Sequence, residues 1–178
     1  MADFFERMQN ASTRVCMTLS IRPGTAADRE TIWRILEPTF REGATYPIPR
    51  DVSRGDALTY WFTPGHSVFV AEDNGVVIGT YYLRANNRGG GAHVANCGYM
   101  SAREAFGRGI ARAMCLHSLD EARARGFKAM QFNFVVSTNE RAVKLWQSCG
   151  FRTVGTLPGV FMHPERGAVD AYVMFREL

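Results

Sequence analysis

The stretch YMSAREAFGRGIAR, residues 99–112, decides the fold of this chain. It begins as the end of an apolar run, passes through a polar turn and continues as a helix that starts at Gly107. Glycine lets another group approach the backbone, and the unpaired N–H groups of a helix start carry the positive end of its dipole. Arg103, Arg108 and Arg112 add three cations around this turn. The pattern is typical of a phosphate-binding loop, although an ordinary strand-to-helix turn can share it.

Two better-known phosphate-binding loops do not match this stretch. A Walker-type loop requires Lys followed by Ser or Thr after its second glycine, where this chain has Ile110 and Ala111. A dinucleotide-binding fingerprint requires three spaced glycines early in a strand–helix–strand unit, and only two are present here. The loop therefore belongs to neither class.

The composition fits one soluble globular domain. At 178 residues with 46% hydrophobic content the chain can bury a real core, and we expect an N-terminal tail at 1–13 and one domain at 14–178. The formal charge of +4 suits an anionic ligand but lacks the concentrated basic face of a nucleic-acid-binding protein. No apolar run approaches the length of a membrane span, and the cysteines and histidines show no metal-ligand spacing. We therefore expect a cytoplasmic protein without metal, membrane contact or nucleic acid, and leave a homodimer open.

Hydrophobic periodicity predicts alternating strands and helices. Strands are expected at 15–21, 67–71, 76–83, 93–101, 129–136, 151–154 and 168–176. Helices are expected from Thr25 or Asp28 to near Pro38 or shortly beyond, at 57–62, at 107–126 and at 137–150. Ser137 and Glu140 have capping-box spacing, and a long excursion with proline and glycine should separate the last two strands. This order predicts an α/β fold, with helices on both faces of a mixed central sheet.

The segment REGATYPIPRD, residues 41–51, is too irregular for a helix or a strand. It holds Glu42 and Tyr46 between two expected helices. Such a loop is either a simple connection or the wall of a substrate pocket. We favour the pocket, because binding residues often lie on loops carried by a rigid scaffold.

The turn at residues 106–111 resembles the pyrophosphate loop of the GNAT superfamily of acyl-CoA-dependent N-acyltransferases, whose pattern is Gln/Arg-x-x-Gly-x-Gly/Ala. Gly109 and Ala111 match this pattern, and Phe106 replaces its polar first residue. NERAVKLWQSCGF, residues 139–151, resembles the second family motif, Asn-x-x-Ala-x-x-Leu-Tyr-x-x-x-Gly-Phe, which packs along the pantetheine arm. The resemblance extends over residues 14–178 and implies the GNAT fold, with a splayed pair of central strands.

The resemblance implies acetyl-CoA as the co-substrate. Pantetheine is expected between the strand ending at residues 99–101 and the strand at 129–136, with the acetyl carbonyl facing an N–H near residues 98–100. The expected cofactor-binding residues are Tyr99, Met100, Ser101, Gly107, Arg108, Gly109, Ile110, Ala111, Arg112, Asn139 and Trp146. Many members have Tyr at the position of Trp146. An indole N–H can donate a hydrogen bond, but it cannot protonate the CoA thiolate.

The implied reaction is direct attack of a neutral amine on the thioester, so the enzyme must align and deprotonate the amine. Cys97 is the alternative nucleophile, although a buried cysteine is usually a small apolar residue. Asn96 and Asn133 lie on facing strands and would be costly to bury without partners, which favours substrate recognition over a structural role. The segments VANCGYM (94–100) and FNFVVSTNERAVKLW (132–146) resemble the branch that acetylates azetidine-2-carboxylate and related proline analogues, in which the matching asparagines hold the substrate.

We therefore expect an N-acetyltransferase that transfers acetyl from acetyl-CoA to the amine of a small molecule, an amino acid or an analogue of one. Asn96 and Asn133 are the expected catalytic residues, and Glu42 and Tyr46 the expected substrate-binding residues. The alternatives are a protein or peptide N-acetyltransferase on the same scaffold and a non-catalytic acyl-CoA-binding sensor.

Overall fold

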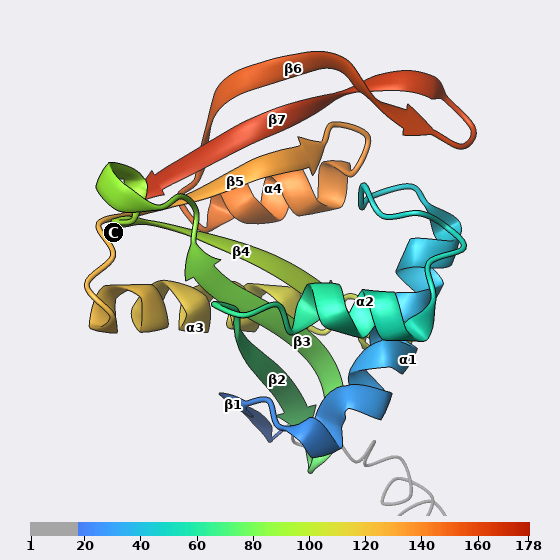
Figure 1. Cartoon of the computed structure of the whole chain (residues 1–178), viewed down its shortest axis with the longest axis vertical. Helices are drawn as coiled ribbons and strands as arrows, with labels where there is room; N and C mark the ends of the chain where they lie inside the picture. The colour runs from blue at the N-terminus through green and yellow to red at the C-terminus, as the bar shows by residue number, and fades with distance from the viewer. Residues whose placement is uncertain (1–17) are drawn as a thin grey trace, which may run out of the picture.

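The computed structural model describes residues 18–178, which form a mixed seven-stranded sheet covered by helices on both faces (Figure 1). Along the sheet the strand order is β1-β2-β3-β4-β5-β7-β6. The strands are β1 (Leu19–Pro23), β2 (Ser67–Asp73), β3 (Val76–Ala85), β4 (Val94–Ser101), β5 (Ala129–Val136), β6 (Arg152–His163) and β7 (Gly167–Glu177). The α-helices are α1 (Arg29–Glu42), α2 (Arg54–Trp61), α3 (Ile110–Ala124) and α4 (Glu140–Ser148), with short 3-10 turns η2 (Ala26–Asp28), η3 (Gly89–Gly91) and η4 (Arg103–Ala105).

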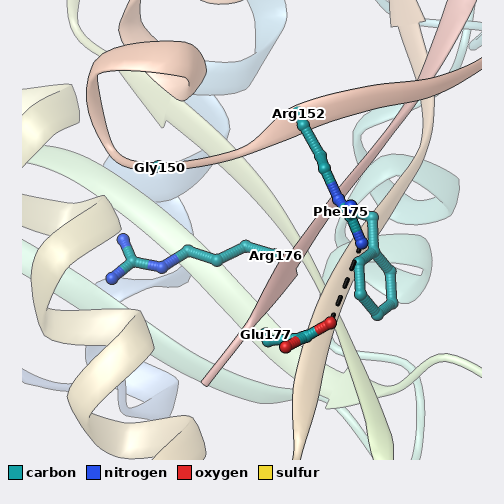
Figure 2. A pocket seen from close by; sticks show the side chains of 5 residues that line it. All are labelled: Gly150, Arg152, Phe175, Arg176 and Glu177. Carbon is teal, nitrogen blue, oxygen red and sulfur yellow. Dashed lines mark ion pairs between the residues drawn. The ribbon is translucent and has the colours of Figure 1, made fainter.

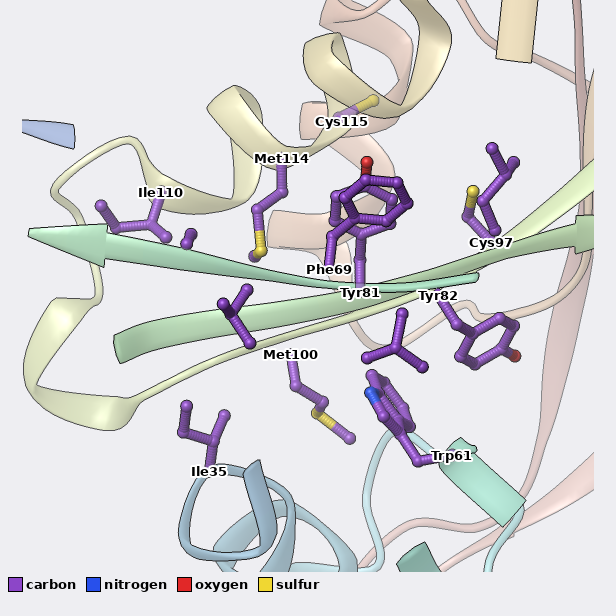
Figure 3. Packing of buried hydrophobic residues seen from close by; sticks show 14 of the residues in the cluster. Ile35, Trp61, Phe69, Tyr81, Tyr82, Cys97, Met100, Ile110, Met114 and Cys115 are labelled. Carbon is purple, nitrogen blue, oxygen red and sulfur yellow. The ribbon is translucent and has the colours of Figure 1, made fainter. Parts of the chain in front are cut away.

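Two layers of buried apolar side chains hold the helices against the sheet (Figure 3). The layer on the α3 face includes Phe69, Tyr81, Cys97, Ile110, Met114 and Cys115. The layer on the α1 and α2 face includes Ile35, Trp61, Tyr82 and Met100. Because side chains alternate along a strand, the even-numbered residues of β3 and β4 face α1 and α2, and the odd-numbered ones face α3.

β4 and β5 are parallel neighbours that pair only at residues 94–95 and 129–130. Beyond these pairs the two strands separate, as expected for a splayed central pair. Gly98 follows on β4, and a Cβ placed there would lie 2.6 Å from Cε1 of Tyr82. Glycine at this position therefore lets the Tyr82 ring lie against the β4 backbone, on the face turned to α1 and α2.

α1 continues past Pro38 and ends at Glu42, shortly beyond the proline, as the sequence pattern allowed. Phe40 is fully buried and anchors the last turn against the sheet, so the helix gains more from packing than it loses from one missing N–H. Gly43, with φ of 67°, ends the helix by donating its N–H to the Thr39 carbonyl. Glu42 is thus the last helical residue and not part of an irregular loop.

α4 begins two residues later than its predicted capping box. Asn139 is the N-cap, and its side-chain oxygen accepts the N–H of Ala142 at 3.3 Å. Ser137 lies in the preceding turn, where its N–H donates to the carbonyl of Asp170 on β7. The capping prediction was wrong because the chain leaving β5 is held by the neighbouring strand.

The expected excursion between the last two strands is a long hairpin of β6 and β7, interrupted by a change of register between Leu157 and Phe161. β6 is an edge strand, where proline is tolerated because a missing N–H need not interrupt the pairing of two neighbouring strands. Pro158 lies in this strand. The N–H of Gly159 donates to the Asp170 carboxylate at 2.9 Å, which fixes the irregular segment.

Other boundaries also differ from the predictions. β1 covers Leu19–Pro23 where a strand at 15–21 was expected, α2 begins at Arg54, and α3 begins at Ile110 with Gly109 as its N-cap. The expected tail at 1–13 and the start of the first predicted strand, residues 15–17, lie outside the described residues.

Candidate active site

A cleft of about 730 Å³ opens where β4 and β5 separate. Its walls come from β3, β4, β5, α4, the turn before α3 and the start of that helix, the end of α1 with the segment that follows it, and Tyr60 of α2. Fourteen of the residues predicted from the sequence line it: Glu42, Tyr46, Asn96, Tyr99, Met100, Ser101, Gly107, Gly109, Ile110, Ala111, Arg112, Asn133, Asn139 and Trp146. The fold therefore gathers residues from distant parts of the chain into one concave site, of a size typical for small-molecule binding.

The glycine turn before α3 forms one end of the cleft. Gly107 and Gly109 have φ angles of 78° and 80°, in the left-handed region that glycine tolerates best. A Cβ at either position would meet nothing within 4 Å, so the backbone conformation, not crowding, requires glycine here. The space in front of this turn is open, and the first N–H groups of the helix lie beside it. This arrangement suits a phosphate group.

The three arginines of the turn have different partners. Arg103 forms an ion pair with Glu42 at 2.9 Å, and Arg108 forms one with Asp73. Arg108 does not line the cleft, and its side chain pairs with Asp73, away from the expected position of the phosphate. Arg112 lines the cleft and donates to the Ser148 hydroxyl at 2.9 Å.

Arg141, which the sequence analysis missed, lies at the same end of the cleft. Its guanidinium carbon is 5.4 Å from the centroid of the Phe106 ring, and both residues line the cleft. Phe106 is 50% exposed, although it is a large apolar side chain. The pair places a cation beside the loop position that carries Gln or Arg in the family pattern. Arg141 could have been predicted from the sequence, because it follows Asn139 by two residues in the second motif.

An aromatic cluster forms the middle wall. The Trp146 ring lies 4.9 Å from the Tyr99 ring and 5.2 Å from the Phe132 ring, measured between centroids. The Tyr99 hydroxyl bonds to Ser118 at 2.7 Å, and burial holds its pKa well above the usual range. Tyr99 therefore offers the cleft its backbone, whose carbonyl accepts the Tyr46 hydroxyl at 3.3 Å.

Asn96 lies at the point where β4 and β5 separate. It is 6% exposed, and its Nδ2 donates to the Gln131 carbonyl at 2.8 Å. Its Oδ1 accepts Nε of Arg84 at 3.3 Å. Since regular strand pairing stops at Met130, the Asn96 side chain binds the next carbonyl of β5 in place of a backbone partner. Asn96 thus has a structural role as well as a place in the cleft.

Asn133 is exposed, contrary to the expectation of a buried carboxamide. It lies on the same face of β5 as Gln131, two residues earlier, at the point where the register of β5 with β7 changes between Phe132 and Val135. Its Oδ1 accepts Nε2 of Gln131 at 2.8 Å, and its Nδ2 donates to Oδ1 of Asn86 at 2.6 Å. A chain of three amides therefore orients Asn133 at the rim.

Tyrosine hydroxyls complete the end of the cleft near Asn96, which we call the acceptor end: residues Tyr46, Tyr60, Tyr82, Arg84, Asn96 and Asn133. The hydroxyls of Tyr60 and Tyr82 are 3.3 Å apart. Burial raises the pKa of Tyr46 and of Tyr82 far above neutrality, so both remain uncharged hydrogen-bonding groups.

Two other titratable groups nearby are also uncharged. Burial raises the pKa of the Cys97 thiol to about 12, which leaves it protonated and poorly nucleophilic. The His66 ring stacks on Tyr82 at 4.2 Å, and burial lowers the pKa of His66. Neither residue therefore supplies a charge to the acceptor end near neutral pH.

A second, more open hollow of about 370 Å³ lies beside Gly150 and the end of β7 (Figure 2). Arg152 pairs with Glu177 at 3.7 Å, and Arg176 points away from that pair and donates to the Cys149 carbonyl. The charged side chains that line this hollow thus already have partners within the protein. Among residues 18–178, no helix is long and apolar enough to cross a membrane, and no cluster of three metal-ligating side chains occurs.

Comparison with known proteins places this geometry among acetyltransferases. Residues 29–151 match the acetyltransferase (GNAT) family. A GCN5-related N-acetyltransferase from Kribbella flavida is 41% identical and superposes with a TM-score of 0.86, over 90% of this chain and 98% of that one. The structure of yncA from Salmonella typhimurium with its cofactor acetyl-CoA is 25% identical, with a TM-score of 0.80 over 90% and 94% of the two chains. N-acetyltransferase aca1 of Schizosaccharomyces pombe is 26% identical over 148 residues, 74% of this chain and 71% of that protein.

Proposed function

The chain belongs to the acetyltransferase (GNAT) family and is an acetyl-CoA-dependent N-acetyltransferase, and from this premise we propose that it acetylates the amine of a small molecule, an amino acid or an analogue of one. This premise sets aside the hypothesis of a non-catalytic sensor. The observation that carries the proposal is the cleft between β4 and β5, which has a phosphate-binding turn at one end and a polar acceptor end at the other.

The residues of the cleft fit acetyl-CoA. The open space before Gly107 and Gly109, together with the N-terminus of the 15-residue helix α3, suits the pyrophosphate, and Arg112 and Arg141 add positive charge there. Residues 99–101 pair with β3 but have no strand partner on the side of β5, and this open edge suits the pantetheine amides, with Trp146 on the same wall. When bound, acetyl-CoA supplies the reactive thioester.

The residues of this chain act by alignment. Cys97 is protonated and buried, which argues against an acetyl-cysteine intermediate and favours direct attack by the amine. Asn96 and Asn133 each keep an unused N–H or lone pair after the contacts described above, so they can orient the acceptor. No carboxylate lines the acceptor end within the described part of the chain, so the proton of the attacking amine is released to solvent or a neutral group.

The position of Tyr46 beside the acceptor end favours a small molecule over a protein. The Tyr46 hydroxyl reaches across to the Tyr99 carbonyl, and the ring of Tyr46 packs against Phe40 at 5.8 Å between centroids. Tyr46 therefore forms a wall of the cleft on the α1 side, which suits a small acceptor better than an extended peptide.

The test is release of free CoA thiol from acetyl-CoA in the presence of amines. We expect thiol release with small amines, and acetylated products of the matching mass, at rates well above those with lysine-containing or N-terminal peptides. Release with peptides alone would contradict the proposed substrate class. No release with any amine or peptide would contradict the proposed function.

A further inference from the structure

A polar strip crosses the sheet face that is otherwise buried by α1 and α2. Arg84 of β3 and Asn96 of β4 are register partners, so their side chains lie next to each other on this face. Tyr82 precedes Arg84 on the same face, where it packs on Trp61 at 5.0 Å between ring centroids. The apolar layer thus ends at Tyr82, and the next side chain along the strand is a charged one that lines the cleft.

Arg84 is only partly used by the protein. Its Nε donates to Oδ1 of Asn96 at 3.3 Å, which fixes the direction of the guanidinium group. No carboxylate of residues 18–178 lies within ion-pair distance of Arg84, and its two terminal nitrogens make no hydrogen bond with a described residue. A half-buried arginine without an anionic partner is unfavourable for stability, because part of its hydration is lost without compensation.

The other charges of the cleft do not neutralise Arg84. Arg112 and Arg141 lie at the phosphate-binding end, and Glu42 is paired with Arg103. The tyrosines beside Arg84 remain uncharged, and the charge of Arg84 contributes to lowering the pKa of the nearby His66. The acceptor end is therefore positively charged, which repels a purely cationic amine and attracts an acceptor that carries an anionic group.

We propose that the acceptor carries a carboxylate next to its amine, and that Arg84 is the binding residue for this carboxylate. The inference rests on the proposed acetyl transfer to a small amine. A guanidinium group presents parallel N–H donors that match the two oxygens of a carboxylate. With the carboxylate held there, the amine lies beside Asn96, and the nearby cation favours the neutral amine that attacks the thioester over its ammonium form.

The experiment compares matched acceptors with and without the carboxylate. Two sets suffice: L-leucine, L-leucinamide and isopentylamine, and L-proline, L-prolinamide and pyrrolidine. With the wild-type protein we expect kcat/KM for at least one of the two amino acids to exceed that of its amide and its decarboxylated amine by about tenfold to a hundredfold, the range for a hydrogen bond to a charged group. The variant Arg84→Gln should lose most of this preference, and Arg84→Lys should keep part of it because the charge remains.

The ratio of kcat/KM for the amino acid to kcat/KM for the matching amine shows whether Arg84 recognises the carboxylate or only supports the fold. If Arg84 only stabilised Asn96, Arg84→Gln would lower the rates with acids and amines alike, and that result would overturn the assignment. Arg88→Gln is the matched control, because Arg88 is an exposed residue of the neighbouring loop that does not line the cleft. It should leave the preference unchanged.

A binding measurement separates this inference from the proposed function. Each acceptor is titrated calorimetrically into protein saturated with CoA. Because CoA carries no acetyl group, binding is measured without acetyl transfer. Selective binding of the amino acids that Arg84→Gln abolishes would support the Arg84 assignment even if no thiol were released. Thiol release without any difference between acids, amides and amines would leave acetyl transfer standing and overturn the carboxylate assignment.

Discussion

Asn96 and Asn133 line the same end of the cleft in different environments. Asn96 is buried and binds the backbone of β5, whereas Asn133 is exposed and belongs to a side-chain network with Gln131 and Asn86. Removal of one buried donor leaves the Gln131 carbonyl without its partner, which costs about 1–3 kcal/mol. Substitution of the two asparagines is therefore expected to affect the stability of the fold differently, although we propose that both orient the acceptor.

We expect Asn133→Ala to lower kcat/KM about tenfold to a hundredfold with little change in Tm or in acetyl-CoA affinity. Asn96→Ala should lower both kcat/KM and Tm. Steady-state kinetics and thermal unfolding on the same preparations measure both quantities, with Asn87→Ala, an exposed change outside the cleft, as the control. Turnover of folded Asn133→Ala equal to that of wild type would refute its role in the site.

Arg141 gives a second prediction at the residue scale. Its cation lies over the exposed Phe106 ring at the phosphate-binding end, so Arg141→Gln should weaken acetyl-CoA binding about twofold to tenfold. The loss should shrink at high salt, because exposed charges are screened. Titration calorimetry at low and high ionic strength measures it.

Lys144→Gln is the control for Arg141, since Lys144 lies on the same helix, with its side chain 77% exposed and outside the cleft. Phe106→Ala should produce a smaller loss than Arg141→Gln. Equal affinities for Arg141→Gln and wild type at low salt would remove Arg141 from the cofactor site.

At the scale of elements, the two ends of α3 offer a matched comparison. Gly109 at the start and Gly126 just beyond the end have φ angles of 80° and 81°, and a Cβ at either meets nothing within 4 Å. Leucine at either position should destabilise the fold similarly, by about 1–2 kcal/mol, because of the left-handed backbone. Only Gly109→Leu should abolish acetyl-CoA binding, because its side chain fills the space before the helix N-terminus.

Calorimetric titration with acetyl-CoA and urea unfolding of both variants test this comparison. An unchanged acetyl-CoA affinity in Gly109→Leu would refute the loop assignment, and a loss of affinity in both variants would point to a general effect on α3.

An ion pair at the start of α1 makes the stability of the fold depend on pH. Nη2 of Arg22 on β1 donates to Asp28 at 2.8 Å, and the Thr25 N–H donates to the same carboxylate at 2.7 Å. The hydrogen bond from Arg22 is the largest cause that holds the pKa of Asp28 well below its usual range, against the effect of burial. In acid, the folded chain thus binds fewer protons at Asp28 than the unfolded chain. The contribution of Asp28 to the free energy of unfolding is therefore full above the ordinary pKa of about 4, and it decreases progressively as the pH falls from there towards the lowered pKa.

We expect Asp28→Asn to lose about 1–3 kcal/mol of unfolding free energy at pH 7, and the difference from wild type to narrow below about pH 4. Urea unfolding at pH 7 and pH 3 measures this difference. Asp120→Asn serves as the control, since its side chain is 78% exposed in a surface pair. A difference that stays the same at both pH values would show that the carboxylate charge is not responsible.

At the scale of the whole molecule, the separation of β4 and β5 creates the site. The acceptor end joins Tyr46, Arg84, Asn96 and Asn133, which come from four different segments of the chain. Their convergence follows from the sheet order, which places β3, β4 and β5 side by side. It also follows from the apolar layer under α1 and α2, whose last member on β3 is Tyr82. A binding cleft at this position is thus a property of the fold, and its charge is set by the residues at the strand ends.

Local patterns in the sequence were enough to predict the glycine turn before α3, the buried stripe of α3 and the strand Ala129–Val136. The glycines at 107 and 109 and the apolar spacing of α3 act within a few residues, so their consequences can be read along the chain. The α/β class and the GNAT family followed from the order of these elements and from two motifs.

The tertiary structure decided what depends on contacts between distant segments. Phe40 is buried by the sheet and carries α1 past Pro38, while Asp170 holds Ser137 and shifts the start of α4. The same holds for charges, because Arg108 and Arg103 are neutralised by Asp73 and Glu42, from elements far away in sequence, whereas Arg84 has no such partner among residues 18–178. Burial and ion pairing arise only when the chain is packed, so the side chains that are left free for a ligand could not be identified from local sequence.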